Sequence, residues 1–171
     1  MLGISSKHRV HSMAIALVLG FVAGGMSLAA SADTAYSAKV KAAMSDLKVE
    51  VEKLGAPKES GGNLSFGATR INDNFAIVDA IKANHGGATA TLFVKKENAF
   101  VRVSTNVMKE GKRAVGTQLD PSGPAIAAMR QGNAYYGIVD ILGKLYDTGY
   151  EPIKTAKGEV VGVYYVGYLM E

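Results

Sequence analysis

The chain has 171 residues, of which 48% are hydrophobic, and carries 19 basic and 15 acidic side chains but no cysteine. The absence of cysteine excludes disulfides, thiol catalysis and thiolate metal sites. The near-balanced charge, with no basic run longer than a pair, argues against nucleic-acid binding, and the length predicts a single domain.

The first 32 residues have the pattern of a secretory signal peptide. Lys7 and Arg9 give a positive start, residues 13–23 form an apolar run, and Ala30-Ser31-Ala32 is a small-residue cleavage site. Cleavage after Ala32 predicts a mature domain at residues 33–171. It removes two basic residues and no acidic one, so the net charge falls from +4 to +2. An uncleaved segment would instead anchor the domain in the membrane.

Three segments have the spacing of amphipathic helices. Apolar residues recur at helical spacing over residues 36–54, and Gly55 and Pro57 end this run. Residues 72–74 offer capping side chains for a helix over residues 75–84. Pro124 suits the first turn of a short helix that ends at Arg130. Residues 58–63 are expected to form a loop, and residues 64–71 a short extended piece.

The rest of the chain predicts strands separated by short turns. Gly143-Lys144 suits a tight hairpin, and residues 155–158 suit a longer one. The predicted fold class is therefore α+β, with an antiparallel sheet of about five strands, a long N-terminal helix and short flanking helices. The predicted strands are residues 90–95, 99–107, 113–119, 135–142, 145–153 and 160–169.

Residues 99–107 form the first strand with candidate binding residues. Side chains on a strand alternate between faces, so Phe100, Arg102, Ser104 and Asn106 are expected to share one face, opposite valines and a threonine. This polar face suits either solvent or a binding pocket. Arginine is well suited to bind a carboxylate, because its planar guanidinium donates two parallel hydrogen bonds.

Tyrosines gather in the last predicted hairpins, where seven of the eight follow residue 134. Tyr146, Thr148 and Tyr150 are expected on one face of their strand, and Tyr136 on one face of the preceding strand. A tyrosine offers an apolar wall with one hydroxyl, which suits a small polar ligand. Strand propensity and core filling explain the same residues without a ligand.

Catalytic patterns are absent from this sequence. No G-x-S-x-G elbow occurs, and His85 is the only histidine after the signal segment, so no serine triad assembles. Asp140, Asp147 and Glu151 are as readily surface charges as an acid–base pair. We therefore predict a protein that is not an enzyme and needs no cofactor or metal.

Four stretches of the chain form a linked set of motifs: TATLFVKKENAFVRVSTNV at residues 89–107, KRAVGTQLD at 112–120, GNAYYGIVDILGKLYDTGYEPI at 132–153 and KGEVVGVYYVGYL at 157–169. In this order and spacing they resemble the sensory core of bacterial extracytoplasmic Cache domains of the Cache 3/Cache 2 fusion type, which have PAS-like folds. The resemblance covers roughly half of the chain. It implies a small-molecule sensor outside the membrane, of the kind found in chemoreceptors and sensor kinases.

The resemblance also implies a ligand site on the sheet. Arg102 would pair with a carboxylate and Ser104 would add a hydrogen bond. Thr117 of the AVGT motif would either face the pocket or simply end a strand. The remaining expected site residues are Tyr136, Tyr146, Thr148 and Tyr150.

The sequence departs from one branch of this family. Citrate-type Cache sensors carry basic residues where this chain has Thr148 and Tyr150, so a monocarboxylate or similar small metabolite is expected instead of a di- or tricarboxylate. We expect a periplasmic domain that presents its ligand to a membrane receptor or sensor kinase. The alternatives are a ligand-free interaction or structural protein, and a membrane-tethered receptor fragment.

Overall fold

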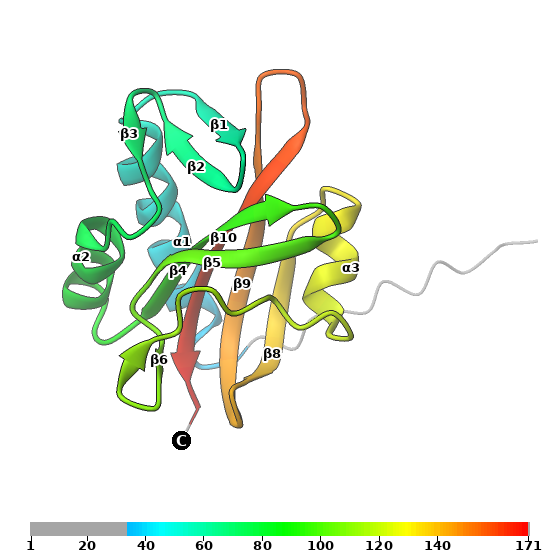
Figure 1. Cartoon of the computed structure of the whole chain (residues 1–171). Coiled ribbons are helices and arrows are strands. Elements are labelled where there is room, and N and C mark those ends of the chain that lie inside the picture. Colours follow the sequence, from blue (N-terminus) through cyan, green and yellow to red (C-terminus); the bar gives the residue numbers. More distant parts are fainter. Residues whose placement is uncertain (1–33, 171) are drawn as a thin grey trace, which may run out of the picture. The chain divides into compact units, whose positions relative to one another are not determined.

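The structure, a computed structural model, describes residues 34–170, so the predicted signal segment lies outside the described residues. Its main element is a five-stranded antiparallel sheet with the strand order β5-β4-β10-β9-β8. This sheet and the helices around it confirm the predicted α+β fold (Figure 1). The strands are β4 (Thr89–Lys96), β5 (Ala99–Thr105), β8 (Tyr135–Ile141), β9 (Lys144–Lys154) and β10 (Val160–Leu169).

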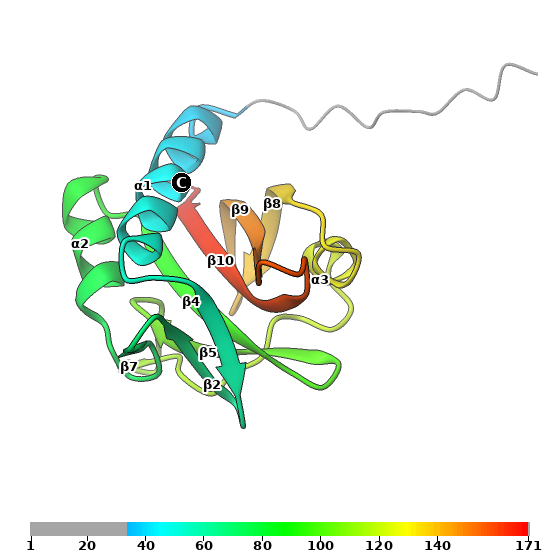
Figure 2. The same ribbon diagram turned by 90° about the horizontal axis from the view of Figure 1, so that it is seen from above.

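The helices lie on the two faces of this sheet. The predicted helices are confirmed as α1 (Ser37–Glu52), α2 (Ala76–Asn84) and α3 (Pro124–Arg130), with Pro124 in the first turn of α3. Helices α1 and α2 cover one face, called the α1 face below, and α3 covers the other, called the α3 face (Figure 2).

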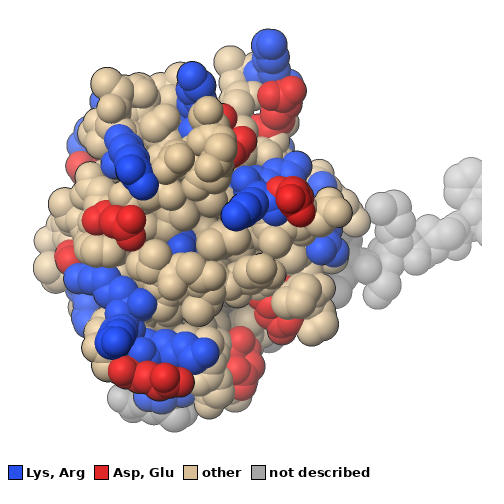
Figure 3. Space-filling model, in the orientation of Figure 1, with Lys and Arg blue, Asp and Glu red and all other residues tan. Residues whose placement is uncertain are grey.

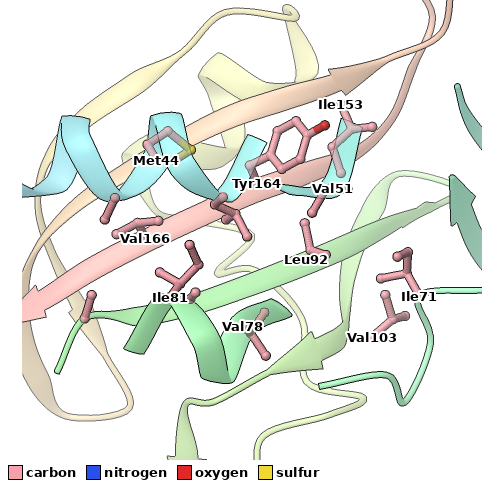
Figure 4. Packing of buried hydrophobic residues seen from close by; sticks show 14 of the residues in the cluster. Met44, Val51, Ile71, Val78, Ile81, Leu92, Val103, Ile153, Tyr164 and Val166 are labelled. Carbon is pink, nitrogen blue, oxygen red and sulfur yellow. The ribbon is translucent and has the colours of Figure 1, made fainter. Parts of the chain in front are cut away.

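Each face of the sheet has its own apolar core. Figure 4 shows the core of the α1 face, where Met44 and Val51 of α1 and Ile81 of α2 pack on Leu92 and Val166 of the sheet. The periodic apolar residues predicted for the first two helices supply this packing. The core of the α3 face includes Phe93, Phe100, Met129, Tyr150, Val163 and Tyr165.

The segment between α1 and α2 differs from the prediction. Residues 58–63 were expected to form a loop, but they belong to a hairpin in a small sheet of β1 (Pro57–Ser60), β2 (Asn63–Phe66) and β3 (Thr69–Arg70). Gly61 and Gly62 both have positive φ angles, 58° and 81°, which glycine adopts without strain in a two-residue hairpin turn. This turn chemistry explains the missed strand.

The predicted strand over residues 113–119 is also wrong for most of its length. Only β6 (Met108–Lys109) and β7 (Lys112–Arg113) pair here, as a separate two-stranded ribbon. Residues 114–119 then run along the outer edge of β5, joined to it by an isolated bridge between Val101 and Gln118. Gly116, with φ at 81°, interrupts the extended backbone that a strand requires.

Gly162 is expected to be essential for the approach of β10 to β4. A Cβ at this buried position would fall on the carbonyl oxygen of Phe93, which as backbone cannot turn aside. Gly162→Ala should lower the free energy of unfolding by about 2 kcal/mol. Gly123→Ala is the control, because its Cβ would meet only the side chain of Asp120, at 3.2 Å or more. Urea unfolding followed by circular dichroism measures both, and equal effects would contradict this reason.

Candidate functional site

Arg102 faces the α3 side of the sheet because of a β-bulge. The register of β4 and β5 pairs Leu92 with Ser104 and Phe93 with Arg102, so Val103 is the extra residue on β5. Phe93 belongs to the core of the α3 face and Leu92 to that of the α1 face. The expectation that Arg102 and Ser104 share a face is therefore wrong.

Ser104 has a different neighbourhood from Arg102. Its hydroxyl donates a 2.6 Å hydrogen bond to the carbonyl oxygen of Asn74, in the turn that leads into α2. This bond fastens the start of α2 to β5. The position of Ser104 on the α1 face separates it from the candidate site.

The guanidinium of Arg102 is buried and only partly bonded. It lies 4.9 Å from the ring centroid of Phe93, a cation–π distance. Its Nη1 donates to Thr117 Oγ1 at 2.8 Å and to the Gln118 carbonyl at 3.3 Å. Its Nε is buried without a partner, and no acidic side chain of residues 34–170 pairs with it. Arg102 is thus a 4% exposed cation without a counter-ion in the described part of the chain.

Residues 114–119 cover this arginine. The backbone of Arg102 exchanges two hydrogen bonds with this segment, from its N–H to the Thr117 carbonyl and from the Gly116 N–H to its carbonyl, both 2.9 Å. The Leu119 N–H donates to the Phe100 carbonyl, also at 2.9 Å. The structure therefore places Thr117 beside Arg102, as a hydrogen-bond acceptor that also donates to the Ala114 carbonyl.

Strand β9 brings its predicted side chains to the same face. Tyr150 is buried in the core of the α3 face, and Tyr146 and Thr148 alternate with it along the strand. The hydroxyl of Thr148, however, donates to the carbonyl of Gly137 on the neighbouring strand β8, at 2.6 Å. Thr148 therefore contributes shape to this face, while its hydroxyl proton is used within the sheet.

The prediction for Tyr136 chose the wrong face of β8. Tyr136 packs against the core of the α1 face, and its hydroxyl donates to Glu151 Oε1 at 2.5 Å. Glu151 also pairs with Lys48 of α1, at 2.7 Å. Burial would raise the pKa of Glu151, but the hydrogen bonds from Lys48 and Tyr136 outweigh it and lower the pKa. These residues fasten α1 to the sheet, away from Arg102.

Arg102, Phe93, Thr117 and the tyrosines around Tyr150 are called the Arg102 cluster below, and two of these tyrosines were missed from the sequence. Tyr165 of β10 pairs in register with Tyr150, and their ring centroids are 4.9 Å apart. Tyr135 pairs with Tyr150 from the other side, with a centroid distance of 6.3 Å. The register of the hairpins would have identified both residues, because it places them directly opposite Tyr150 on the neighbouring strands.

Electrostatics link Arg102 to the two buried phenols. Burial lowers the pKa of Arg102, and the nearby Tyr150 and Tyr165 only partly offset this. Burial raises the pKa of Tyr150 well above its usual value, against the opposing influence of Arg102. The pKa of the fully buried Tyr165 is raised for the same reason. Both phenols therefore stay neutral near pH 7 and keep a hydroxyl proton to donate.

This arrangement offers hydrogen-bond donors to an anion. The two Nη1 protons of Arg102 serve residues 117 and 118, which leaves the edge formed by Nε and Nη2 without acceptors in the described part. That edge has the fork geometry that binds both oxygens of a carboxylate. The Tyr150 hydroxyl also has no hydrogen-bond partner within residues 34–170. Thr89 Oγ1, in contrast, lies 3.0 Å from the Tyr165 hydroxyl.

Four surface cavities of about 470 to 520 Å³ lie elsewhere on the fold, and none of them is lined by Arg102 or Tyr150. Charged side chains surround a mostly uncharged centre in the view of Figure 3. Within the described residues, no cluster of three or more histidine, aspartate or glutamate side chains is suited to hold a metal ion.

The comparison with protein families identifies a family of sensory domains. The family profile of the Cache 3/Cache 2 fusion domain matches residues 22–171. Comparison with curated protein sequences finds no significant match.

Two solved structures are similar in fold. The E. coli DcuS sensor domain is 19% identical, with a TM-score of 0.40, over 54% of this chain and 62% of that chain. The A. aeolicus nlh2 GAF domain in an inactive state is 12% identical, with a TM-score of 0.44, over 77% of this chain and 83% of that chain. The match with DcuS therefore spans less than two thirds of that sensor domain.

Arg102→Met should not destabilise the ligand-free protein, because it removes a buried charge that has no counter-ion. We expect the free energy of unfolding to rise by about 1 kcal/mol. Arg113→Met is the matched control, since Arg113 makes two 2.8 Å hydrogen bonds to Asp79 and lies 4.4 Å from the ring centroid of Phe75. The control should lose about 1 kcal/mol. A larger loss in Arg102→Met, measured by urea unfolding, would assign Arg102 a structural role.

Alkaline pH should destabilise the fold through the buried phenols. A phenol whose pKa is raised in the folded state keeps its proton there after the unfolded chain has lost it, above about pH 10. Stability is therefore full below pH 10 and falls as pH rises. Tyr150 and Tyr165 should each contribute a loss of about 1 kcal/mol between pH 10 and 11. Tyr150→Phe should remove one such contribution, and an unchanged pH dependence of unfolding in this variant would refute the assignment.

Proposed function

Because the chain belongs to the Cache 3/Cache 2 fusion family of sensory domains, we propose that it binds a small monocarboxylate at the Arg102 cluster. The observation that carries this proposal is the buried guanidinium, whose Nε–Nη2 edge lacks acceptors among the described residues. A bound carboxylate supplies the missing counter-ion and receives two parallel hydrogen bonds. The Tyr150 hydroxyl adds a third donor.

The chemistry of the surrounding residues favours a ligand with a single carboxylate. Arg102 is the only lysine or arginine in the cluster, whose other members are Thr117, Phe93 and tyrosines. A second carboxylate would have no cation to pair with and would lose its hydration on burial. The aromatic rings of Tyr150 and Tyr165 suit an apolar ligand body.

Entry of the ligand requires movement of residues 114–119. Arg102 is 4% exposed under this cover, and the cover is held to β5 by three backbone hydrogen bonds. The side chains of Val115 and Gln118 are exposed, whereas Ala114 and Leu119 are buried in the core of the α3 face, so opening must also expose this apolar surface. In this proposal the cover opens to admit the ligand and closes over it.

Cache domains are extracellular or periplasmic sensors that pass the bound state to a signalling module. No helix within residues 34–170 combines the length and the apolar character needed to cross a membrane. We propose that the mature domain, residues 33–171, lies in the periplasm and presents its bound form to a membrane receptor or sensor kinase. The signal-like pattern of residues 1–32 supports this location.

A second candidate function is a ligand-free interaction protein that keeps the sensory fold. The observation in its favour is that Arg102 already ties the cover in place, through Thr117 and Gln118. In that case the guanidinium is a structural clamp, and no small carboxylate stabilises the protein.

A thermal-shift series tests the first proposal. Acetate, propionate and butyrate are compared with their neutral amides and with citrate. A monocarboxylate at 100 times its dissociation constant should add about 2.7 kcal/mol, or roughly 8 °C in Tm. The amides and citrate should not. Arg102→Met should abolish the shift, whereas Arg70→Met, at an exposed position of the small sheet, should retain it.

Other outcomes decide between the alternatives. A carboxylate shift that survives in Arg102→Met would move the site away from this cluster. No shift with any of these acids, together with a destabilised Arg102→Met variant, would favour the interaction protein.

A further inference from the structure

A second feature of the fold is a surface cavity of about 500 Å³ at one end of the sheet. Three elements form it: the turn between β4 and β5, the C-terminal end of α3, and the start of the hairpin between β9 and β10. Its volume falls in the range of small-molecule sites. It contains none of the residues of the Arg102 cluster.

Positive charge dominates the lining of this cavity. Lys95, Arg130 and Lys154 contribute three cations, against one carboxylate from Glu97. None of the three cations forms an ion pair with an acidic residue of the described part. Arg130 makes only a 3.2 Å hydrogen bond, from Nη2 to the Asn98 carbonyl. Figure 3 shows basic side chains gathered over this region beside an acidic one.

The ammonium group of Lys154 lies beside Gly132. A Cβ at Gly132 would lie 3.3 Å from both Cε and Nζ of Lys154, a tight contact that a small shift of the flexible lysine end would relieve. Gly132 also has a φ of 72°, which glycine adopts most easily. The lysine thus crosses the backbone just after α3 and presents its charge to the cavity.

Apolar side chains complete the lining. Phe100 and Met129, 1% and 0% exposed, form a buried floor beneath the cavity, and the partly buried Val160 contributes accessible carbon surface. An inorganic anion would leave this surface without a partner. A cavity with cations at its rim and carbon surface at Val160 matches a molecule that has both a charged and an apolar part.

The neighbouring hollow limits the charge of the ligand. It shares Lys95, Glu97 and Val160 with this cavity and adds the carboxylates of Glu59 and Glu159. These acidic groups, together with Glu97, repel a second negative charge on a bound molecule. The charge balance therefore favours a monoanion.

We propose that this cavity is a second binding site, separate from the Arg102 cluster, for a small organic monoanion whose carboxylate is joined to an apolar body. Lys154 and Arg130 bind the carboxylate, and the apolar body lies against Val160, above the buried side chains of Phe100 and Met129. Charged residues at the rim and carbon surface inside give the two-part recognition that this class of ligand requires.

An NMR titration of the protein expressed from its full sequence tests this site, with benzoate as the probe. Benzoate should shift the methyl resonance of Met129 and the amide resonance of Gly132. Benzyl alcohol and inorganic phosphate should shift neither, because the first lacks the charge and the second lacks the apolar body.

Charge variants give effects of opposite sign. Lys154→Gln should weaken benzoate binding about three- to tenfold, and Glu97→Gln should strengthen it about two- to threefold. Lys144→Gln, an exposed change at the start of β9, should have no effect. Arg102→Met should also leave these shifts unchanged. A negative result for this cavity can therefore be told apart from a negative result for the Arg102 cluster.

Three outcomes would overturn the second site. Equal binding of benzoate and benzyl alcohol would show an apolar cavity without anion recognition. A loss of binding in Glu97→Gln would indicate that a cationic group is recognised there. The absence of shifts at Met129 and Gly132, with both resonances assigned in a well-dispersed spectrum, would show that benzoate does not bind in the cavity.

Discussion

The β-bulge between β4 and β5 is the constraint on which the candidate site depends. One extra residue, Val103, lets Arg102 point into the α3 face while Ser104 points to the α1 face and fastens the turn before α2. Without the bulge, the two side chains would share a face. In a strand without the bulge, either Arg102 would lie on the α1 face beneath α2, or Ser104 would lie in the aromatic core of the α3 face. The bulge thus lets a single strand serve two different layers.

The position of Arg102 has a thermodynamic consequence for the ligand-free domain. A buried guanidinium without a counter-ion costs solvation energy that its stacking on Phe93 and its bonds to residues 117 and 118 recover only in part. A charge in an otherwise aromatic core is understandable if a bound ligand supplies its counter-ion. Stability of the free state and affinity for an anion therefore oppose each other at this residue.

The sequence predicted the helices and the main sheet because their signals are local. The apolar spacing of α1 and α2 and the turn at Gly143 need no tertiary information. The site was only partly predictable. Alternation correctly grouped Tyr146, Thr148 and Tyr150, but it cannot detect a bulge, so Ser104 was misplaced. For β8, alternation separated Tyr135 from Tyr136 correctly, and only the register with β9 shows that Tyr135 is the one beside Tyr150.

The hydrogen bonds of Arg102 also suggest how binding would reach the surface. A carboxylate on the Nε–Nη2 edge leaves the Nη1 bonds to Thr117 and Gln118 intact, so ligand and cover do not compete for the same protons. The ligand neutralises the charge that the cover must keep buried, and thereby favours the closed cover over the open one. Val115 and Met108 on the connected segment are exposed. Closure of the cover would therefore order a part of the surface that a partner protein can contact. In the proposed function, the same arginine therefore binds the ligand and couples its presence to the surface.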